Sequence, residues 1–168
     1  MTRSTVSLAQ QWRSGEETAG LELPLLRTLA LDVSVSSLRG LADRVLDLGR
    51  VYVRYSEGPE RDDRPSIDTE SELELPGLSV NPLHAEPWWT RPFEDWLARQ
   101  ICQYQQLQEK NPDRFAWVLQ GVEVGRGPDC EPLLRDVRPV ARLDASVLSE
   151  AGERYRARFH AGRGPEDA

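Results

Sequence analysis

The apolar residues of this chain recur at two spacings, and the order of these spacings predicts a mixed fold. Within residues 28–35, leucines and valines alternate with smaller or polar residues, which is the period-two pattern of a half-buried strand. Residues 51–56 and 115–124 are enriched in valine and aromatic side chains, which also favours strands, and Val137 to Leu143 is expected to form a further strand. Because Pro139 cannot donate to a ladder, we expect it in an edge strand or at a strand start.

Three other segments, 37–48, 92–109 and 146–160, carry apolar residues at helical spacing. Their apolar stripes contain Leu38, Leu41, Ala42, Val45 and Leu46, then Phe93, Leu97, Ile101 and Tyr104, then Leu148, Ala151, Tyr155 and Phe159. The expected N-caps are, in the same order, Ser36 or Ser37, Thr90, and Asp144. We expect the three helices to pack on one sheet through these stripes.

The order of the elements predicts an α+β fold with a small, mostly antiparallel sheet and about three helices. We expect a single domain over residues 25–161, a partly disordered N-terminal segment over 1–24 and a disordered tail over 162–168. The acidic, turn-prone segment 57–74 is expected to be an exposed loop.

Composition narrows the range of partners. The net charge of −7 disfavours nucleic acid and anionic membranes. No apolar stretch reaches about 18 residues, the length of a membrane span, and the N-terminus lacks the apolar core of a signal peptide. The two cysteines, Cys102 and Cys130, do not have metal-ligand spacing. We therefore expect a cytoplasmic protein without a metal site, for which a small molecule or a protein is the partner.

The segment 75–89 is the most unusual part of the chain. It combines three prolines, a glycine, Ser79, Asn81 and two adjacent tryptophans, Trp88 and Trp89. Loops normally carry polar residues, because chain that runs over the surface has little apolar area to bury. A rigid aromatic loop is therefore expected either to cover a core or to form one wall of a site.

Packing of both indoles is the more common outcome. However, neighbouring indoles seldom point the same way, so one could remain free to stack on a flat ligand. We expect one of the two to be largely buried and the other to border a cleft that contains Asp129 or Glu131. The residues that could add aromatic walls to this site are Tyr52, Tyr55, Trp117 and Tyr104.

Arg54, in the predicted strand 51–56, has two alternative environments. If Tyr52 faces the core, Arg54 shares its face and needs an anionic partner, whereas the opposite orientation leaves Arg54 in solvent. The alternation alone does not choose between them. In a functional role, Arg54 would hold a phosphate or carboxylate through two hydrogen bonds.

A second rigid loop, 125–132, contains Asp129 and Glu131 between two prolines. Gly-Pro pairs are first of all turn signals. Carboxylates fixed in such a loop are nevertheless well placed to accept a hydrogen bond or a proton from a ligand. Arg126 could instead pair with one of them, which would make the group structural.

Three blocks of the sequence resemble a known family. They begin at Val51-Tyr-Val-Arg-Tyr, at Leu75-Pro-Gly-Leu-Ser-Val-Asn-Pro and at Trp117-Val-Leu, and the last continues through Gly125-Arg-Gly-Pro-Asp-Cys-Glu-Pro. Together they are similar to the domain-of-unknown-function family 6098, found chiefly in actinobacteria, over roughly residues 28 to 160. The resemblance implies a single-domain bacterial protein and brings no established activity.

These features lead to two functional hypotheses. The first is a small-molecule site formed by the loops 75–89 and 125–132, which we expect to lie side by side over one end of the sheet. In an enzymatic version, Arg54, Ser79 and Glu131 occur in an order similar to that of ADP-ribosyltransferases, with NAD as the substrate. Arg54 would bind the pyrophosphate, Glu131 a ribose hydroxyl, and a tryptophan the nicotinamide. The alternative is a non-catalytic accessory protein whose loops engage another protein.

Overall fold

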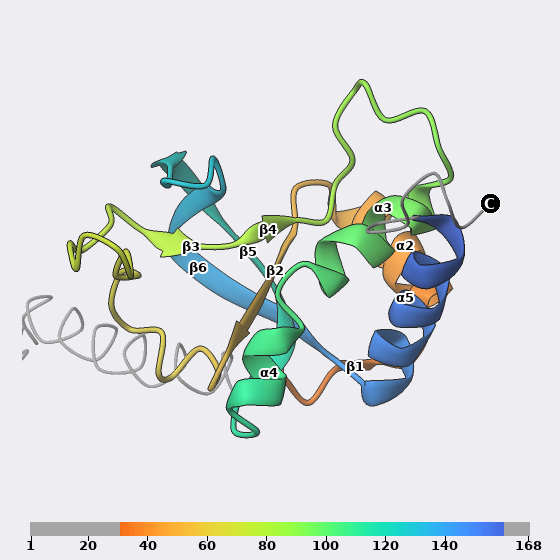
Figure 1. Ribbon diagram of the computed structural model, residues 1–168, viewed down its shortest axis with the longest axis horizontal. Coiled ribbons are helices and arrows are strands. Elements are labelled where there is room, and N and C mark those ends of the chain that lie inside the picture. The colour runs from red at the N-terminus through yellow and green to blue at the C-terminus, as the bar shows by residue number, and fades with distance from the viewer. Residues whose placement is uncertain (1–30, 160–168) are drawn as a thin grey trace, which may run out of the picture.

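The computed structural model describes residues 31–159, and these form a curled sheet with helices on one side (Figure 1). The strands are β1 (Ser34–Val35), β2 (Tyr52–Ser56), β3 (Leu78–Ser79), β4 (Asn81–Pro82), β5 (Phe115–Arg126) and β6 (Pro132–Leu143). The helices are α2 (Leu38–Leu48), α3 (Phe93–Cys102), the short α4 (Gln106–Lys110) and α5 (Ala145–Arg158). The prediction of an α+β fold with a mostly antiparallel sheet is confirmed.

The sheet closes on itself through two very short strands. β5 pairs antiparallel with β2 on one edge and with β6 on the other. β3 pairs with β6, at Leu78 opposite Leu134, and β4 pairs with β2, at Asn81 opposite Val53. Because only Val80 separates β3 from β4, the segment 78–82 joins the two far edges into a barrel-like ring. β1 adds a parallel pairing at the end of β6.

The ring separates two apolar cores. The interior core contains Tyr52, Leu78, Val80, Trp117, Leu119 and Leu134. The outer core lies between the sheet and α2, α3 and α5, and its fully buried members include Leu41, Val53, Leu97, Ile101 and Val147. Both faces of β2 are therefore covered, which explains why this strand reads as an almost continuous apolar run.

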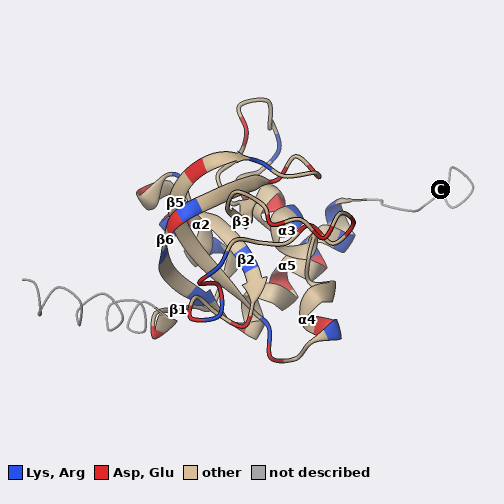
Figure 2. Ribbon diagram, turned by 90° about the vertical axis from the view of Figure 1, so that its left-hand side faces the viewer, with Lys and Arg blue, Asp and Glu red and all other residues tan. Residues whose placement is uncertain are grey.

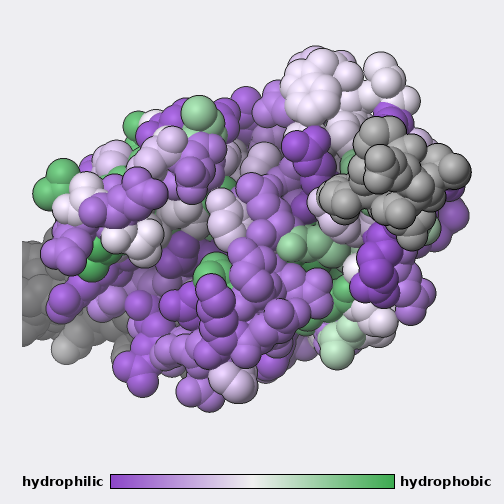
Figure 3. Space-filling model, in the orientation of Figure 1, coloured by the Kyte–Doolittle hydropathy of each residue, from purple (hydrophilic) through white to green (hydrophobic). Residues whose placement is uncertain are grey.

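The predicted helix faces are confirmed as core except at Leu46. Leu41, Leu97 and Ile101 are fully buried, and Tyr155 packs against the same cluster while staying partly accessible. Leu46, expected on the apolar stripe of α2, is 70% exposed, so the buried face of this helix ends at Val45. Burial of an amphipathic stripe supplies most of the stability of such short helices. Figure 3 shows that the outer surface in this view is mainly hydrophilic, with hydrophobic residues in small separate groups. Figure 2 shows Lys and Arg interspersed with Asp and Glu along the loops and strands.

The N-terminus of α2 has the expected cap, whereas that of α3 does not. Ser37 caps α2, since its hydroxyl accepts from the Gly40 N–H at 3.1 Å. The expected Thr90 cap is wrong, because α3 begins only at Phe93, directly after Pro92. Proline disfavours helical geometry in the residue before it, so the helix does not extend back to position 90.

Several predicted boundaries are corrected by tertiary pairing. Of the predicted strand 28–35, residues 31–35 are described, and among these only Ser34–Val35 pairs, with the last two residues of β6. The predicted helix 92–109 is divided by a turn at 103–105 into α3 and α4. Pro139 lies in the middle of β6 and not at its start, but within the described residues only β5 pairs with β6 at this position, so the expected edge placement holds locally. A register shift in the β5–β6 pairing lies beside it. Residues 28–30, the segments 1–24 and 162–168, and the predicted helix end at position 160 lie outside the described residues.

Candidate functional site

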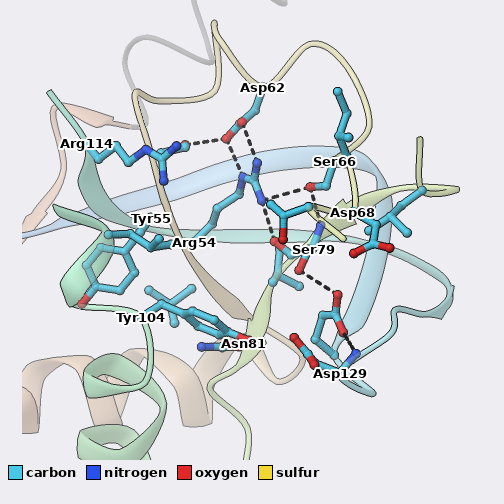
Figure 4. A pocket seen from close by; sticks show the side chains of 18 of the residues that line it. Arg54, Tyr55, Asp62, Ser66, Asp68, Ser79, Asn81, Tyr104, Arg114 and Asp129 are labelled. Carbon is cyan, nitrogen blue, oxygen red and sulfur yellow. Dashed lines mark hydrogen bonds and ion pairs between the residues drawn. The ribbon is translucent and has the colours of Figure 1, made fainter. Parts of the chain in front are cut away.

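A cleft of about 680 Å³ opens beside β4 (Figure 4). Its walls are the end of β2 and the loop after it, the β3–β4 segment, the α3–α4 connection and the turn between β5 and β6. A cleft of this size falls within the roughly 300–1,000 Å³ of small-molecule sites. Of the predicted site residues, Arg54, Ser79, Asn81, Asp129 and Glu131 line the cleft, whereas Tyr52, Trp88, Trp89 and Arg126 do not.

Arg54 has the anionic partner that the first of its two alternatives requires. Tyr52 faces the interior of the ring, and Arg54 lies on the same face of β2. The Arg54 guanidinium binds the Asp62 carboxylate through two hydrogen bonds, Nε to Oδ2 at 2.7 Å and Nη2 to Oδ1 at 2.9 Å. Its Nη1 donates to the carbonyl of Ser79 at 2.6 Å and to the hydroxyl of Ser66 at 3.3 Å.

The partners of Arg54 define its role in the wall of the cleft. All three guanidinium nitrogens are engaged with the loop after β2 or with β3. The Arg54 and Asp62 side chains are only 18% and 9% exposed. Arg54 therefore fastens the loop carrying Asp62 to the sheet, and a ligand phosphate would have to compete with a pre-formed bidentate carboxylate.

Ser79 and Glu131, far apart in sequence, meet at the opposite wall. The Ser79 hydroxyl donates to Glu131 Oε1 at 3.1 Å, and the Asp129 backbone N–H donates to Glu131 Oε2 at 3.0 Å. Each carboxylate oxygen thus has one fixed donor, and the headgroup is held in one orientation. A Cβ on Gly127 would overlap this carboxylate, so the glycine makes room for it.

Arg126 does not neutralise the loop carboxylates. Its Nη2 pairs with Glu123 at 3.0 Å, and its Nη1 donates to the Cys130 carbonyl at 3.3 Å. The alternative in which Arg126 pairs with Asp129 or Glu131 is therefore wrong. A register shift in β5 between Glu123 and Gly125 separates this pair, whereas Asp129 and Glu131 lie in the turn that follows β5.

Asn81 and Tyr104 form the part of the cleft nearest the helices. Asn81 is 4% exposed, and its Nδ2 donates to the Gln100 carbonyl at 3.2 Å. Within residues 31–159 the Asn81 Oδ1 accepts no hydrogen bond. It is not a fully buried atom without a partner, and Asn81 lines the cleft, so this oxygen is accessible from the cleft. Burial, and then the charges of Asp129 and Glu131, raise the pKa of the Tyr104 phenol above its ordinary value of 10.0.

Tyr52 belongs to the interior core, which explains its absence from the cleft. It is 1% exposed, and its hydroxyl donates to Glu123 Oε2 at 3.3 Å. Burial first, and then the Glu123 charge, raise the pKa of Tyr52 above 10.0. The placement of Tyr52 as a cleft residue is therefore corrected: the ring interior takes its side chain.

Trp88 and Trp89 lie away from the cleft, against the helices. Trp88 is 63% exposed, and Trp89 is half-buried beside Trp96, with ring centroids 5.2 Å apart. The expectation that one is largely buried and the other borders the acidic loop is wrong on both counts. After β4 the chain turns toward α3 and α5, where Trp89 also stacks on Phe159.

The two rigid loops meet only in part. Residues 75–82 lie beside the β5–β6 turn, as the Val80 N–H donating to the Pro132 carbonyl at 3.1 Å shows. The remaining residues of the 75–89 segment leave this end of the sheet. The side-by-side arrangement therefore holds for the part with Ser79 and Asn81, and not for the tryptophans.

Sequence reasoning missed two residues that bind Arg54 in the wall of the cleft, Asp62 and Ser66. Both lie in the segment 57–74, where one acid among many carries no distinguishing signal. The signal that was available is Arg54 itself, because an arginine on the inner face of a strand requires an acid from a nearby loop. Tyr104, expected both on an apolar stripe and as an aromatic wall, packs against the outer core and also lines the cleft.

Comparison with known proteins adds the family. Residues 28–164 match the model of the Family of unknown function (DUF6098). The chain belongs to this family. No curated protein and no solved structure matches it. The matched residues include the whole ring and all the walls of the cleft.

Membrane-spanning helices and clusters of metal-binding side chains are both absent from the described residues. Within residues 31–159, no helix has the length and apolar character needed to cross a membrane. The same residues hold no group of three or more His, Cys, Asp or Glu side chains arranged to bind a metal ion.

Proposed function

We propose that this protein binds a small polar molecule in the cleft beside β4. The observation that carries the proposal is the convergence of Asn81, Tyr104, Asp129 and Glu131 on one cavity of about 680 Å³ (Figure 4). These residues come from three separate parts of the chain, and ligand sites typically combine an aromatic wall with a few convergent polar groups.

The internal bonding of the cleft supports this proposal. Glu131 is oriented by two donors, and Arg54 holds the facing loop in place. Preorganised groups bind more tightly because less conformational freedom is lost when the ligand arrives. The family domain thus provides a rigid acceptor surface.

An NMR titration tests the proposal. Agmatine, ribose and NAD represent cationic, neutral and anionic small molecules, and ¹H–¹⁵N spectra report which amides respond. We expect at least one compound to shift the amides of residues 79–81, 103–107 and 128–131 saturably. Thr69→Trp places an indole at the rim of the cleft and should weaken that binding. Thr90→Trp is the matched control, because Thr90 is also exposed but does not line the cleft. No cleft response to any of the three compounds would refute the proposal.

A second candidate function is ADP-ribosyl transfer from NAD. It is favoured by the contiguity of its three predicted residues: Arg54 donates to the Ser79 carbonyl, and the Ser79 hydroxyl donates to Glu131. Glu131 would accept from a ribose hydroxyl, with Ser79 orienting it. Since Asp62 occupies Arg54, the pyrophosphate would depend on Arg61 and Arg114, which also line the cleft.

Nicotinamide release tests this second candidate. Chromatography of protein incubated with NAD should show free nicotinamide, and Glu131→Gln should abolish it. Asp136→Asn is the control, because Asp136 is exposed in the adjoining strand β6 and does not line the cleft. Absence of nicotinamide with the natural sequence would remove the enzymatic candidate and leave the binding proposal standing.

A further inference from the structure

The ionised groups of the cleft do not balance. The carboxylates that line it are Glu57, Asp62, Asp68, Asp129 and Glu131, and the guanidiniums are Arg54, Arg61 and Arg114. Two internal pairs form, Arg54 with Asp62 at 2.7 Å and Arg61 with Glu57 at 3.9 Å. The lining groups outside these two pairs are three carboxylates, Asp68, Asp129 and Glu131, and one guanidinium, that of Arg114. The free charge facing a ligand is therefore predominantly negative.

The excess negative charge is concentrated at one wall. Within residues 31–159, neither Asp129 nor Glu131 has a cationic group within ion-pair distance. Arg126, the nearest arginine in sequence, is bound to Glu123. Arg114 lies on the far side of the cleft from Asp129 (Figure 4). A ligand cation is thus drawn to the turn between β5 and β6.

The neutral groups at this wall also call for donors. The Asn81 side chain is more than nine-tenths buried, and its Oδ1, which accepts no hydrogen bond from the described residues, is an acceptor at the cleft. Each Glu131 oxygen uses one of its lone pairs on Ser79 or on the Asp129 amide, which leaves a second lone pair for a ligand. A ligand group with several donor hydrogens would satisfy these carboxylate oxygens and the amide oxygen together. An ammonium or guanidinium supplies three or more N–H donors and also the charge opposite to that of the carboxylates.

An apolar surface lies beside these acceptors. Tyr104 and Leu107 line the cleft from the α3–α4 connection, and Pro128 lines it from the turn. Such a surface suits the methylene chain of an alkyl cation, because apolar area leaves water while the charged end reaches the carboxylates.

We infer that the ligand is an organic cation with several N–H donors, an alkylammonium or alkylguanidinium whose charged end lies between Asn81, Asp129 and Glu131. The inference rests on the proposed function, because it names the chemical class that this cleft takes. An anionic ligand is disfavoured, since Asp62 already occupies Arg54 and repulsion from the free carboxylates opposes a second negative charge.

Calorimetric titration with three probes of similar length tests the class. Agmatine is the cation, 1,5-pentanediol the neutral compound and glutarate the anion. We expect agmatine to bind, and its affinity to fall as salt is raised, because the attraction between charges is screened. Glu131→Gln keeps the shape of the side chain and should weaken agmatine binding by about tenfold or more. Asp136→Asn removes the same charge from an exposed position of β6 in the same hairpin, away from the cleft, and should leave the affinity unchanged.

The outcomes separate this inference from the proposed function. Binding of pentanediol or glutarate as tight as that of agmatine, abolished by Thr69→Trp, would overturn the cationic class and support the cleft as a site. Agmatine binding that survives both Glu131→Gln and Thr69→Trp would place the cation elsewhere and overturn the inference. Failure of all three probes, together with no cleft response in the NMR titration, would refute both.

Discussion

Asp62→Ala should destabilise the fold by about 3 kcal/mol, because it removes the partner of a largely shielded guanidinium. The Arg54 side chain is 18% exposed and that of Asp62 is 9% exposed, so neither charge is well solvated without the other. Removing one member of a buried pair costs roughly 3–5 kcal/mol, and the residual exposure places this pair at the lower end. The Ser56 hydroxyl, which donates to Asp62 and accepts from Trp117 Nε1, would also lose a partner.

Urea denaturation followed by tryptophan fluorescence measures this effect. The midpoint should fall while the slope with denaturant stays constant, since the folded state remains compact. Asp63→Ala is the matched control, because Asp63 is the exposed neighbour of Asp62 in the same acidic loop. Its substitution should change the unfolding free energy by less than about 0.5 kcal/mol.

A double variant separates the loss of the pair from the stranding of one charge. Arg54→Met combined with Asp62→Leu replaces the ion pair by apolar side chains, and it should be less destabilised than Asp62→Ala alone. Equal stability of Asp62→Ala and Asp63→Ala would refute the reasoning, because it would mean that Arg54 is adequately solvated without Asp62.

Three other outcomes are expected. Leu97→Ala should lower the free energy of unfolding by about 2–5 kcal/mol, because it leaves a cavity in the outer core. The control Leu46→Ala, at a 70% exposed position, should change it little. Equal losses of stability in urea denaturation would contradict the packing. Gly127→Ala should leave the protein folded but displace the Glu131 carboxylate, and so weaken agmatine binding about as much as Glu131→Gln does; unchanged calorimetric affinity would count against this positioning. Burial raises the pKa of the Tyr55 phenol above 10.0, so the folded state keeps its proton to higher pH and stability is lost as pH rises above about 10. Tyr55→Phe should reduce that alkaline loss in urea titrations between about pH 9 and about pH 11.

The elements that sequence patterns predict well are those whose signal is local. α2 and α5 and the strands β2 and β5 are recovered with errors of a few residues, because each has a periodic apolar face or a β-branched run of its own. The closure of the ring has no such signal. β3 and β4 contribute two residues each, too few for any period, and their pairing partners lie in β6 and β2.

The candidate site divides in the same way. Rigid loops with Ser79 and Glu131 can be singled out from their prolines, but their contact depends on β3 pairing with β6 across more than fifty positions. The two tryptophans were wrongly predicted to border the cleft, because the composition of a loop does not indicate the direction that the chain takes after a strand. One short pairing at β4 ends beside the cleft, and the residues after it continue toward α3.

Arg54 shows why loss of function alone would be a poor guide to this site. It was predicted to contact a ligand, and it contacts Asp62, Ser66 and Ser79 instead. Removing it would free the loop that forms one wall of the cleft and would strand a buried carboxylate, so stability and binding would fall together. Glu131 differs, because its donors are a serine hydroxyl and a backbone amide. Both can donate to water when the charge is removed, so no buried charge loses its partner. A residue that acts on the ligand is therefore identified here by a loss of affinity at unchanged stability.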